Sequence, residues 1–162
     1  MGDKNTIVIS TFPACGKSWC FNNLGDKYNM SDSDSSLYSW IRTIDENGEE
    51  VKVRNPDFPQ NYIKHIKENI GKADVIFVSS HSIVRQALGK DKIKFTLVVP
   101  KKNCLNEWMI RYINRGNDND FIDTQINNWD KWLDEIDEEK GTYSKLIKLE
   151  QRQYISDIIH KC

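Results

Sequence analysis

Short apolar runs recur along this chain and predict the strands of a buried sheet. Continuous apolar segments of four or five residues are typical of parallel strands that are covered on both faces. Such runs predict strands at 6–10, 75–78 and 95–99, and weaker runs predict strands at 27–31 and 146–149.

Amphipathic segments separate these runs and predict helices. In 59–70, apolar side chains recur with helical spacing up to Gly71, and the same period extends over 119–139. Further helices are predicted at 18–24, 82–88 and 103–115, each followed by Gly, and at 37–43 and 151–160. The polar segment 44–57 carries a hairpin-turn signal at Glu46-Asn47-Gly48.

Strands that alternate with helices predict parallel βαβ units. We therefore expect an α/β fold with three α/β/α layers and a five-stranded, mostly parallel sheet. The 162 residues match the size of one domain, and no linker divides 1–162.

The composition bears on whether the chain binds nucleic acid, membranes or zinc. The net charge of −1 disfavours extended nucleic-acid contact without excluding a local patch, and no apolar run reaches transmembrane length, so no membrane contact is expected. The four cysteines and three histidines show no zinc-site spacing. We expect free thiols and a cytoplasmic location.

The segment Thr11–Ser18 (TFPACGKS) follows the first strand and precedes a helix, which is the context of a phosphate-binding P-loop. In this motif backbone amides surround the β-phosphate, Lys17 reaches the β- and γ-phosphates, and Ser18 binds Mg²⁺. The sequence thus predicts ATP and Mg²⁺ as ligands, with Pro13, Ala14, Cys15, Gly16, Lys17 and Ser18 in the binding loop.

The loop departs from the usual pattern at Thr11, where the motif has Gly. Because Thr does not readily adopt positive φ, the loop must begin in an ordinary β conformation. Cys15 lies near a helix N-terminus and Lys17, which can lower a thiol pKa. The alternative, which we favour, is that Cys15 is a small residue whose backbone does the binding.

Two acidic residues, Asp32 and Asp34, follow the second strand at the edge of the sheet that carries the loop. We expect Asp32 to bind the metal and Asp34 to contact the acceptor and accept a proton from an attacking hydroxyl. The alternative is a solvated turn that caps the next helix.

Ser79, Ser80 and His81 end the 75–78 strand, where a P-loop ATPase carries a metal-binding Asp; Asp74 lies at the other end. His81 is a candidate substrate contact or a neighbour of a helix cap. Arg85, one helical turn on, can bind an acceptor phosphate or lie on the surface.

Arg111 and Arg115 are four residues apart on one predicted helix, so that both guanidinium groups project from one face. Two such groups can clamp a transferring phosphoryl group. The alternative for Arg111 is a salt bridge with Glu107, one turn earlier.

Of the aromatic residues, Trp129 falls on a helical apolar stripe and is predicted to lie in the core. Tyr38 and Trp40 follow the acidic stretch, where they can stack on a base or pack beneath the loop.

The chain resembles P-loop kinases of the nucleoside-monophosphate-kinase group, and among them small nucleotide-kinase-like proteins of bacteriophages. The resemblance rests on stretches that span most of the chain: 12–18 (FPACGKS), 31–36 (SDSDSS), 55–59 (NPDFP), 76–81 (IFVSSH) with Val84-Arg85, and 111–118. It implies P-loop roles for Lys17 and Ser18, and lid roles on the phosphates for Arg111 and Arg115.

The resemblance also implies an ATP- and Mg²⁺-dependent (deoxy)nucleoside monophosphate kinase. A hydroxyl acceptor, on a nucleoside or on a modified base or an end in DNA or RNA, is the alternative, and it suits Asp34 as a base. A non-catalytic nucleotide-binding module is a further alternative.

Overall fold

The computed structural model describes residues 5–33, 35–139 and 142–162. Five strands form one sheet in the order β2-β5-β1-β6-β7, and each neighbouring pair is parallel. They are β1 (Ile7–Thr11), β2 (Met30–Asp32), β5 (Val75–Ser79), β6 (Thr96–Pro100) and β7 (Lys145–Leu149). The predicted α/β fold with a five-stranded parallel sheet is therefore confirmed.

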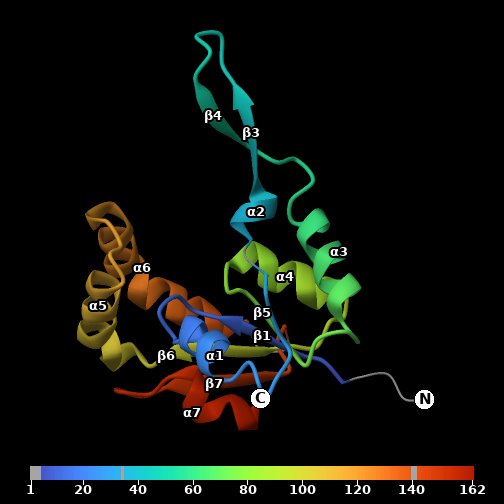
Figure 1. Ribbon diagram of the computed structural model, residues 1–162. Helices are drawn as coiled ribbons and strands as arrows, with labels where there is room; N and C mark the ends of the chain where they lie inside the picture. The colour runs from blue at the N-terminus through green and yellow to red at the C-terminus, as the bar shows by residue number, and fades with distance from the viewer. Residues whose placement is uncertain (1–4, 34, 140–141) are drawn as a thin grey trace.

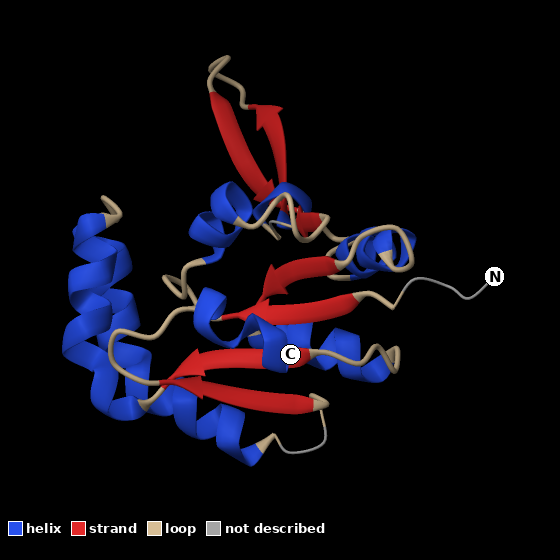
Figure 2. Cartoon of the chain, turned by 60° about the horizontal axis from the view of Figure 1, so that its bottom comes forward, coloured by secondary structure: helices blue, strands red, loops and turns tan. Residues whose placement is uncertain are grey.

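Helices lie on both faces of this sheet (Figures 1 and 2), with α1 and α7 on one face and α4 and α6 on the other. The described ranges contain α1 (Lys17–Asn23), α2 (Ser36–Ser39), α3 (Gln60–Asn69), α4 (Ser82–Lys90), α5 (Leu105–Asn114), α6 (Asn119–Glu138) and α7 (Ile155–Ile158). This arrangement is compatible with three α/β/α layers. None of these helices is long and apolar enough to cross a bilayer.

The core explains the apolar runs of the sequence. Strands β5 and β6 are covered on both faces, so that Val75 to Val78 and Leu97 to Val99 are all buried. Trp129 of α6 is also buried, as predicted, and its ring meets Phe12 edge-on at a centroid distance of 5.7 Å. Each large apolar side chain buried in this way contributes roughly 1.5–3 kcal/mol.

A two-stranded hairpin replaces most of the helix predicted at 37–43. Helix α2 is only one turn long, and the chain then forms β3 (Trp40–Ile44) and β4 (Glu50–Arg54), which pair antiparallel and project from the sheet (Figure 1). The predicted turn at 46–48 is confirmed: the Asp45 carboxylate accepts bonds from the amides of Asn47 and Glu49. Cross-strand pairing of β-branched residues outweighs the weak helical pattern.

The C-terminal helix predicted at 151–160 is wrong over its first half. Helix α7 begins only at Ile155, because Arg152 adopts a positive φ of 64° and the Tyr154 amide, directly before the helix, donates to the Asp157 carboxylate at 2.9 Å. Helix α4 also continues one residue beyond Gly89, its predicted end, and the second strand begins at Met30 rather than at residue 27.

Candidate functional site

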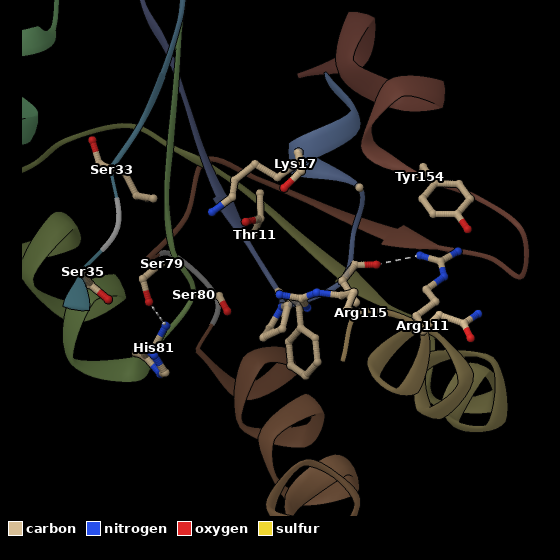
Figure 3. Close-up of a pocket in the computed structure, with 17 residues that line it drawn as sticks. Thr11, Lys17, Ser33, Ser35, Ser79, Ser80, His81, Arg111, Arg115 and Tyr154 are labelled. Carbon is tan, nitrogen blue, oxygen red and sulfur yellow. Dashed lines mark hydrogen bonds between the residues drawn. The ribbon is translucent and has the colours of Figure 1, made fainter. Parts of the chain in front are cut away.

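A pocket of about 480 Å³ opens at the carboxyl ends of β1 and β5 (Figure 3). The chain passes from β1 outward to β2, returns to β5, and then crosses β1 to reach β6. Such a reversal of strand order is where open α/β sheets place ligands. The predicted loop, Thr11–Ser18, supplies most of one wall, with Cys15 the only member that does not line the pocket.

The carbonyl groups of the loop point away from the pocket because other segments bind them. Trp108 Nε1 donates to the Pro13 carbonyl at 3.0 Å, and Arg111 Nη1 donates to that of Ala14 at 2.9 Å. The Ile155 amide donates to the Cys15 carbonyl at 2.8 Å. Three successive peptide groups are therefore oriented from outside the loop.

The amide groups of the loop remain available. Within the described part of the chain, no group accepts a hydrogen bond from the backbone amides of Ala14, Gly16, Lys17 or Ser18, whereas Pro13 and Ala14 lie in a hydrogen-bonded turn that ends at Cys15. Ala14 and Gly16 both have positive φ, of 65° and 94°. Alternation of ordinary and left-handed residues produces a concave amide nest that attracts anions. The loop therefore has the geometry of an anion cradle at the start of α1.

Thr11 does not form part of the turn. It is the last residue of β1, in register with Ser79 and Val98 of the neighbouring strands. The predicted ordinary β conformation at this position is confirmed. The left-handed residue instead is Ala14, which costs about 1–2 kcal/mol for a side chain with a Cβ atom.

Arg111 holds the loop rather than projecting into open solvent. Its guanidinium lies between the rings of Trp108 and Tyr154, at 3.8 and 3.9 Å from their centroids. It also forms the predicted alternative, a salt bridge with Glu107 at 2.9 Å, and donates to the Gln153 carbonyl at 2.8 Å. Arg111 is therefore buried and fixed, although one edge of it lines the pocket.

Arg115 differs from Arg111 although both lie at the same end of α5. It is exposed, lines the pocket, and makes no ion pair with the described residues. In Figure 3 its side chain lies across the pocket between the loop and the Ser79-Ser80-His81 segment. Of the two predicted clamp residues, Arg115 is therefore the one that is free to engage a ligand.

Lys17 reaches the end of β2. Its Nζ atom lies 2.9 Å from Asp32 Oδ1, and both side chains are about one-third exposed, at 33% and 39%. The prediction that Asp32 lies at the same edge of the sheet as Lys17 of the loop is therefore confirmed. Asp34, the predicted base, lies outside the described residues.

The described residues do not form an independent metal site. Across the described ranges there is no cluster of three or more His, Cys, Asp or Glu side chains that could hold a metal. Mg²⁺ usually takes one or two protein ligands and completes its shell with water and substrate phosphates. Ser18 lines the pocket at the exposed start of α1, whereas Asp32 is paired with Lys17 and is not among the lining residues, so that binding of Mg²⁺ by these two residues stays a prediction.

Hydroxyl groups form the wall opposite Arg111 and Tyr154. This wall contains Ser33, Ser35, Ser79 and Ser80, together with His81 (Figure 3). The Ser33 hydroxyl is buried and has no hydrogen-bond partner among the described residues. A buried, unsatisfied hydroxyl at a pocket wall is suited to a polar ligand group.

The imidazole of His81 has a lowered pKa, although the residue is exposed. Partial desolvation of the ring, together with the positive charges of Arg85 and Arg54, lowers its pKa below the usual value. Its backbone amide donates to the Ser79 hydroxyl at 3.3 Å. His81 is the N-cap residue of α4 and also lines the pocket, so its position agrees with the capping alternative, while a contact with substrate stays a prediction.

Arg85 does not reach this pocket. It is buried in α4 and forms an ion pair with Glu139 at 2.6 Å, lining instead a neighbouring cavity of about 150 Å³. The expectation that Arg85 lies on the surface, if it is not a substrate ligand, is wrong. The Arg85 side chain instead faces α6 and pairs with Glu139, which directly follows that helix.

Cys15 is buried beneath the loop, and burial raises the pKa of its thiol to about 12. The expectation of a backbone role is therefore supported over that of an activated thiolate. All four cysteines are free, as predicted. Tyr154 and Trp108 are site residues that no local motif marks, whereas Ser33 lies within the acidic stretch 31–36 although no role was predicted for it.

No model of a known protein family matches this chain, and a search of curated proteins also found no match.

Proposed function

We propose that this protein is an ATP- and Mg²⁺-dependent phosphotransferase. The observation that carries the proposal is the loop of residues 12–18, whose carbonyls are bound from outside and whose amides line a pocket beside Lys17. Amides oriented in this way, at a helix N-terminus, suit the β-phosphate of a nucleotide. The strained backbone at Ala14 is of the kind that clusters at ligand sites, which supports an anionic ligand for this loop.

In the proposed reaction the acceptor oxygen forms a bond to the γ-phosphorus of ATP as the bond to the β,γ-bridging oxygen breaks. ADP leaves with the electron pair of that bond. Lys17 neutralises charge on the β- and γ-phosphates, and Arg115 neutralises charge that develops on the transferring group. Mg²⁺, held by Ser18 and Asp32 with the nucleotide, supplies further charge neutralisation.

The resemblance to monophosphate kinases makes a (deoxy)nucleoside monophosphate the first candidate acceptor. One observation favours the second candidate, a hydroxyl group. The wall opposite Arg111 and Tyr154 holds four serines and a histidine with a lowered pKa, and none of these is a cation that could bind an acceptor phosphate. Arg85, the cation predicted for that task, pairs with Glu139.

A hydroxyl acceptor must lose its proton as the phosphoryl group arrives. Asp32, which pairs with Lys17 of the loop, and His81, which lines the pocket, can accept it, and the sequence also offers Asp34 for this role. A monophosphate acceptor has no proton to lose. The two candidates therefore differ in their need for a base.

The test is transfer from γ-labelled ATP to nucleoside monophosphates, nucleosides and oligonucleotides, with Lys17→Ala as the control. We expect one acceptor class to be labelled, with a loss of at least ~100-fold in Lys17→Ala because a pre-placed cation is removed. ATP binding without transfer to any acceptor would instead establish a nucleotide-binding module.

A further inference from the structure

The β3–β4 hairpin has two chemically different faces. Residues directly opposite each other in an antiparallel pair share a face, and so do alternate residues along a strand. One face therefore carries Trp40 opposite Arg54 and Arg42 opposite Lys52, with Ile44 and Glu50 nearer the tip. The other face carries Ile41 opposite Val53 and Thr43 opposite Val51.

On the face that carries Trp40, the two pairs nearest the base of the hairpin are Trp40–Arg54 and Arg42–Lys52. We call these four residues the root face. All four are exposed, and the Arg54 guanidinium stacks 4.4 Å from the centroid of the Trp40 ring. Arg42 and Lys52 are like charges in direct cross-strand register, which destabilises a hairpin. One ion pair offsets part of this repulsion: Arg42 lies 3.4 Å from Glu50, and both side chains are largely exposed, so that the pair is weak.

The root face continues toward the pocket. Helix α2 connects the two, because Ser35, its N-cap residue, lines the pocket and Ser39 ends the helix directly before β3. The Asn55 amide donates to the Ser39 carbonyl at 2.9 Å, which ties the base of the hairpin to α2. The acidic residues of the hairpin, among them Asp45, Glu46 and Glu49, lie toward the tip. Positive charge is thus concentrated at the end nearer the site.

We propose that the root face binds a single-stranded nucleic acid whose terminal hydroxyl is the phosphoryl acceptor. Three cations fit its phosphates, and Trp40 with the stacked Arg54 plane fits an unpaired base. The near-zero net charge of the chain conceals this local patch, which covers only two pairs of residues. The proposal about the acceptor rests on the proposed function, whereas strand binding does not.

The alternative binding partner for an exposed hairpin is a second protein. The apolar face with Ile41 and Val53 would suit it, but the root face presents cations and an exposed indole instead. A two-stranded hairpin in isolation is only marginally stable. An anionic ligand on the root face would reduce the repulsion between Arg42 and Lys52 and thereby stabilise the hairpin. Charge complementarity therefore favours the nucleic acid.

The test is fluorescence anisotropy with a 3′-labelled oligothymidylate that carries a free 5′-hydroxyl, measured without ATP at several salt concentrations. Because single strands give about −0.7 per neutralised phosphate, three cations predict a slope of log K against log salt of about −2. Arg42→Gln/Lys52→Gln should reduce the slope to about −0.7. Trp40→Ala should weaken binding by about 5- to 150-fold, the range expected for one stacked base.

Matched variants guard against loss of the hairpin itself. Arg42→Lys/Lys52→Arg and Trp40→Phe keep the charge and the ring and should bind within about threefold of the unmodified protein. Lys94→Gln/Lys131→Gln removes the same charge from exposed positions elsewhere and should leave the slope unchanged. Equal losses in the remote and root-face pairs would overturn the proposal, as would self-association that depends on Ile41 with no strand binding.

The two proposals fail in different ways. Strand binding that requires the root face, with no labelling of any acceptor, would retain the nucleic-acid site and refute phosphoryl transfer. Labelling of mononucleosides or monophosphates alone, with no strand binding, would refute the root-face proposal and leave the phosphotransferase intact.

Discussion

Replacement of Gly16 by Ala should destabilise the protein for two separable reasons. The first is the backbone, because φ at this position is +94° and a Cβ atom in the left-handed region costs about 1–2 kcal/mol. The second is a collision: the new Cβ would lie 2.8 Å from Tyr154 Cδ1 and 3.1 Å from Tyr154 Cβ. Overpacking of this kind costs roughly 1–3 kcal/mol, so the total is about 2–5 kcal/mol.

Tyr154 cannot easily move to relieve that collision. Its ring stacks on the Arg111 guanidinium at 3.9 Å, and its backbone amide donates to the Asp157 carboxylate at 2.9 Å. Tyr154→Ala removes the nearer contact but leaves the backbone cost of Gly16→Ala unchanged. The double variant should therefore be more stable than the sum of the two single effects, by about 1 kcal/mol or more.

The assay is urea unfolding of the four proteins of this double-mutant cycle, followed by far-UV circular dichroism. Tyr154→Phe serves as the control, since it keeps the ring and should give no relief. Effects of Gly16→Ala and Tyr154→Ala that add within about 0.5 kcal/mol would refute the reasoning, because residues in contact should couple.

Three further predictions concern the pocket and the thiols. Arg115→Ala should lower kcat more than it raises KM for ATP, and Arg115→Lys should restore activity only in part because an ammonium lacks the planar fork; an unchanged kcat would assign Arg115 to ground-state binding. Asp32→Asn should lower the rate by ~10²–10⁴-fold with near-normal ATP affinity if Asp32 accepts the acceptor proton, whereas recovery in excess Mg²⁺ would assign it to the metal. Burial raises the pKa of Cys15 to about 12, so its thiolate fraction at pH 8 should be about 10⁻⁴, and iodoacetamide should label it only after unfolding. Between the unfolded pKa near 9 and this folded value, the folded state binds more protons, so the same shift should lower the free energy of unfolding as pH rises through that interval; rapid labelling of native Cys15 would contradict both expectations.

The central sheet could be predicted because its pattern is local. Burial on both faces forces every residue of β5 to be apolar, and the run Val75–Val78 shows this directly in the sequence. The hairpin at 40–54 was predicted only at its turn. Its strands depend on pairing between Ile41 and Val53 and between Thr43 and Val51, and the helical pattern at 37–43, which overlaps β3, did not indicate where that pairing begins.

The position of the phosphate loop could also be predicted, but not the means by which it is held. Tyr154 packs on Gly16 and the Ile155 amide binds the Cys15 carbonyl across more than 130 residues of chain. No local pattern reports such a contact. The positive φ of Ala14 is equally unmarked, because Ala has no preference for the left-handed region, and the strain is maintained by Arg111 through the Ala14 carbonyl.

The most direct measurement of the central claim is isothermal titration calorimetry of adenosine, AMP, ADP and ATP, each with Mg²⁺, against the unmodified protein and Lys17→Ala. A loop that binds the β-phosphate predicts tight one-to-one binding of ADP and ATP, much weaker binding of AMP and adenosine, and a loss of at least ~10-fold for ATP in Lys17→Ala. Equal affinity for all four ligands, or an unchanged ATP affinity in Lys17→Ala, would contradict the assignment of residues 11–18 as a nucleotide-phosphate site.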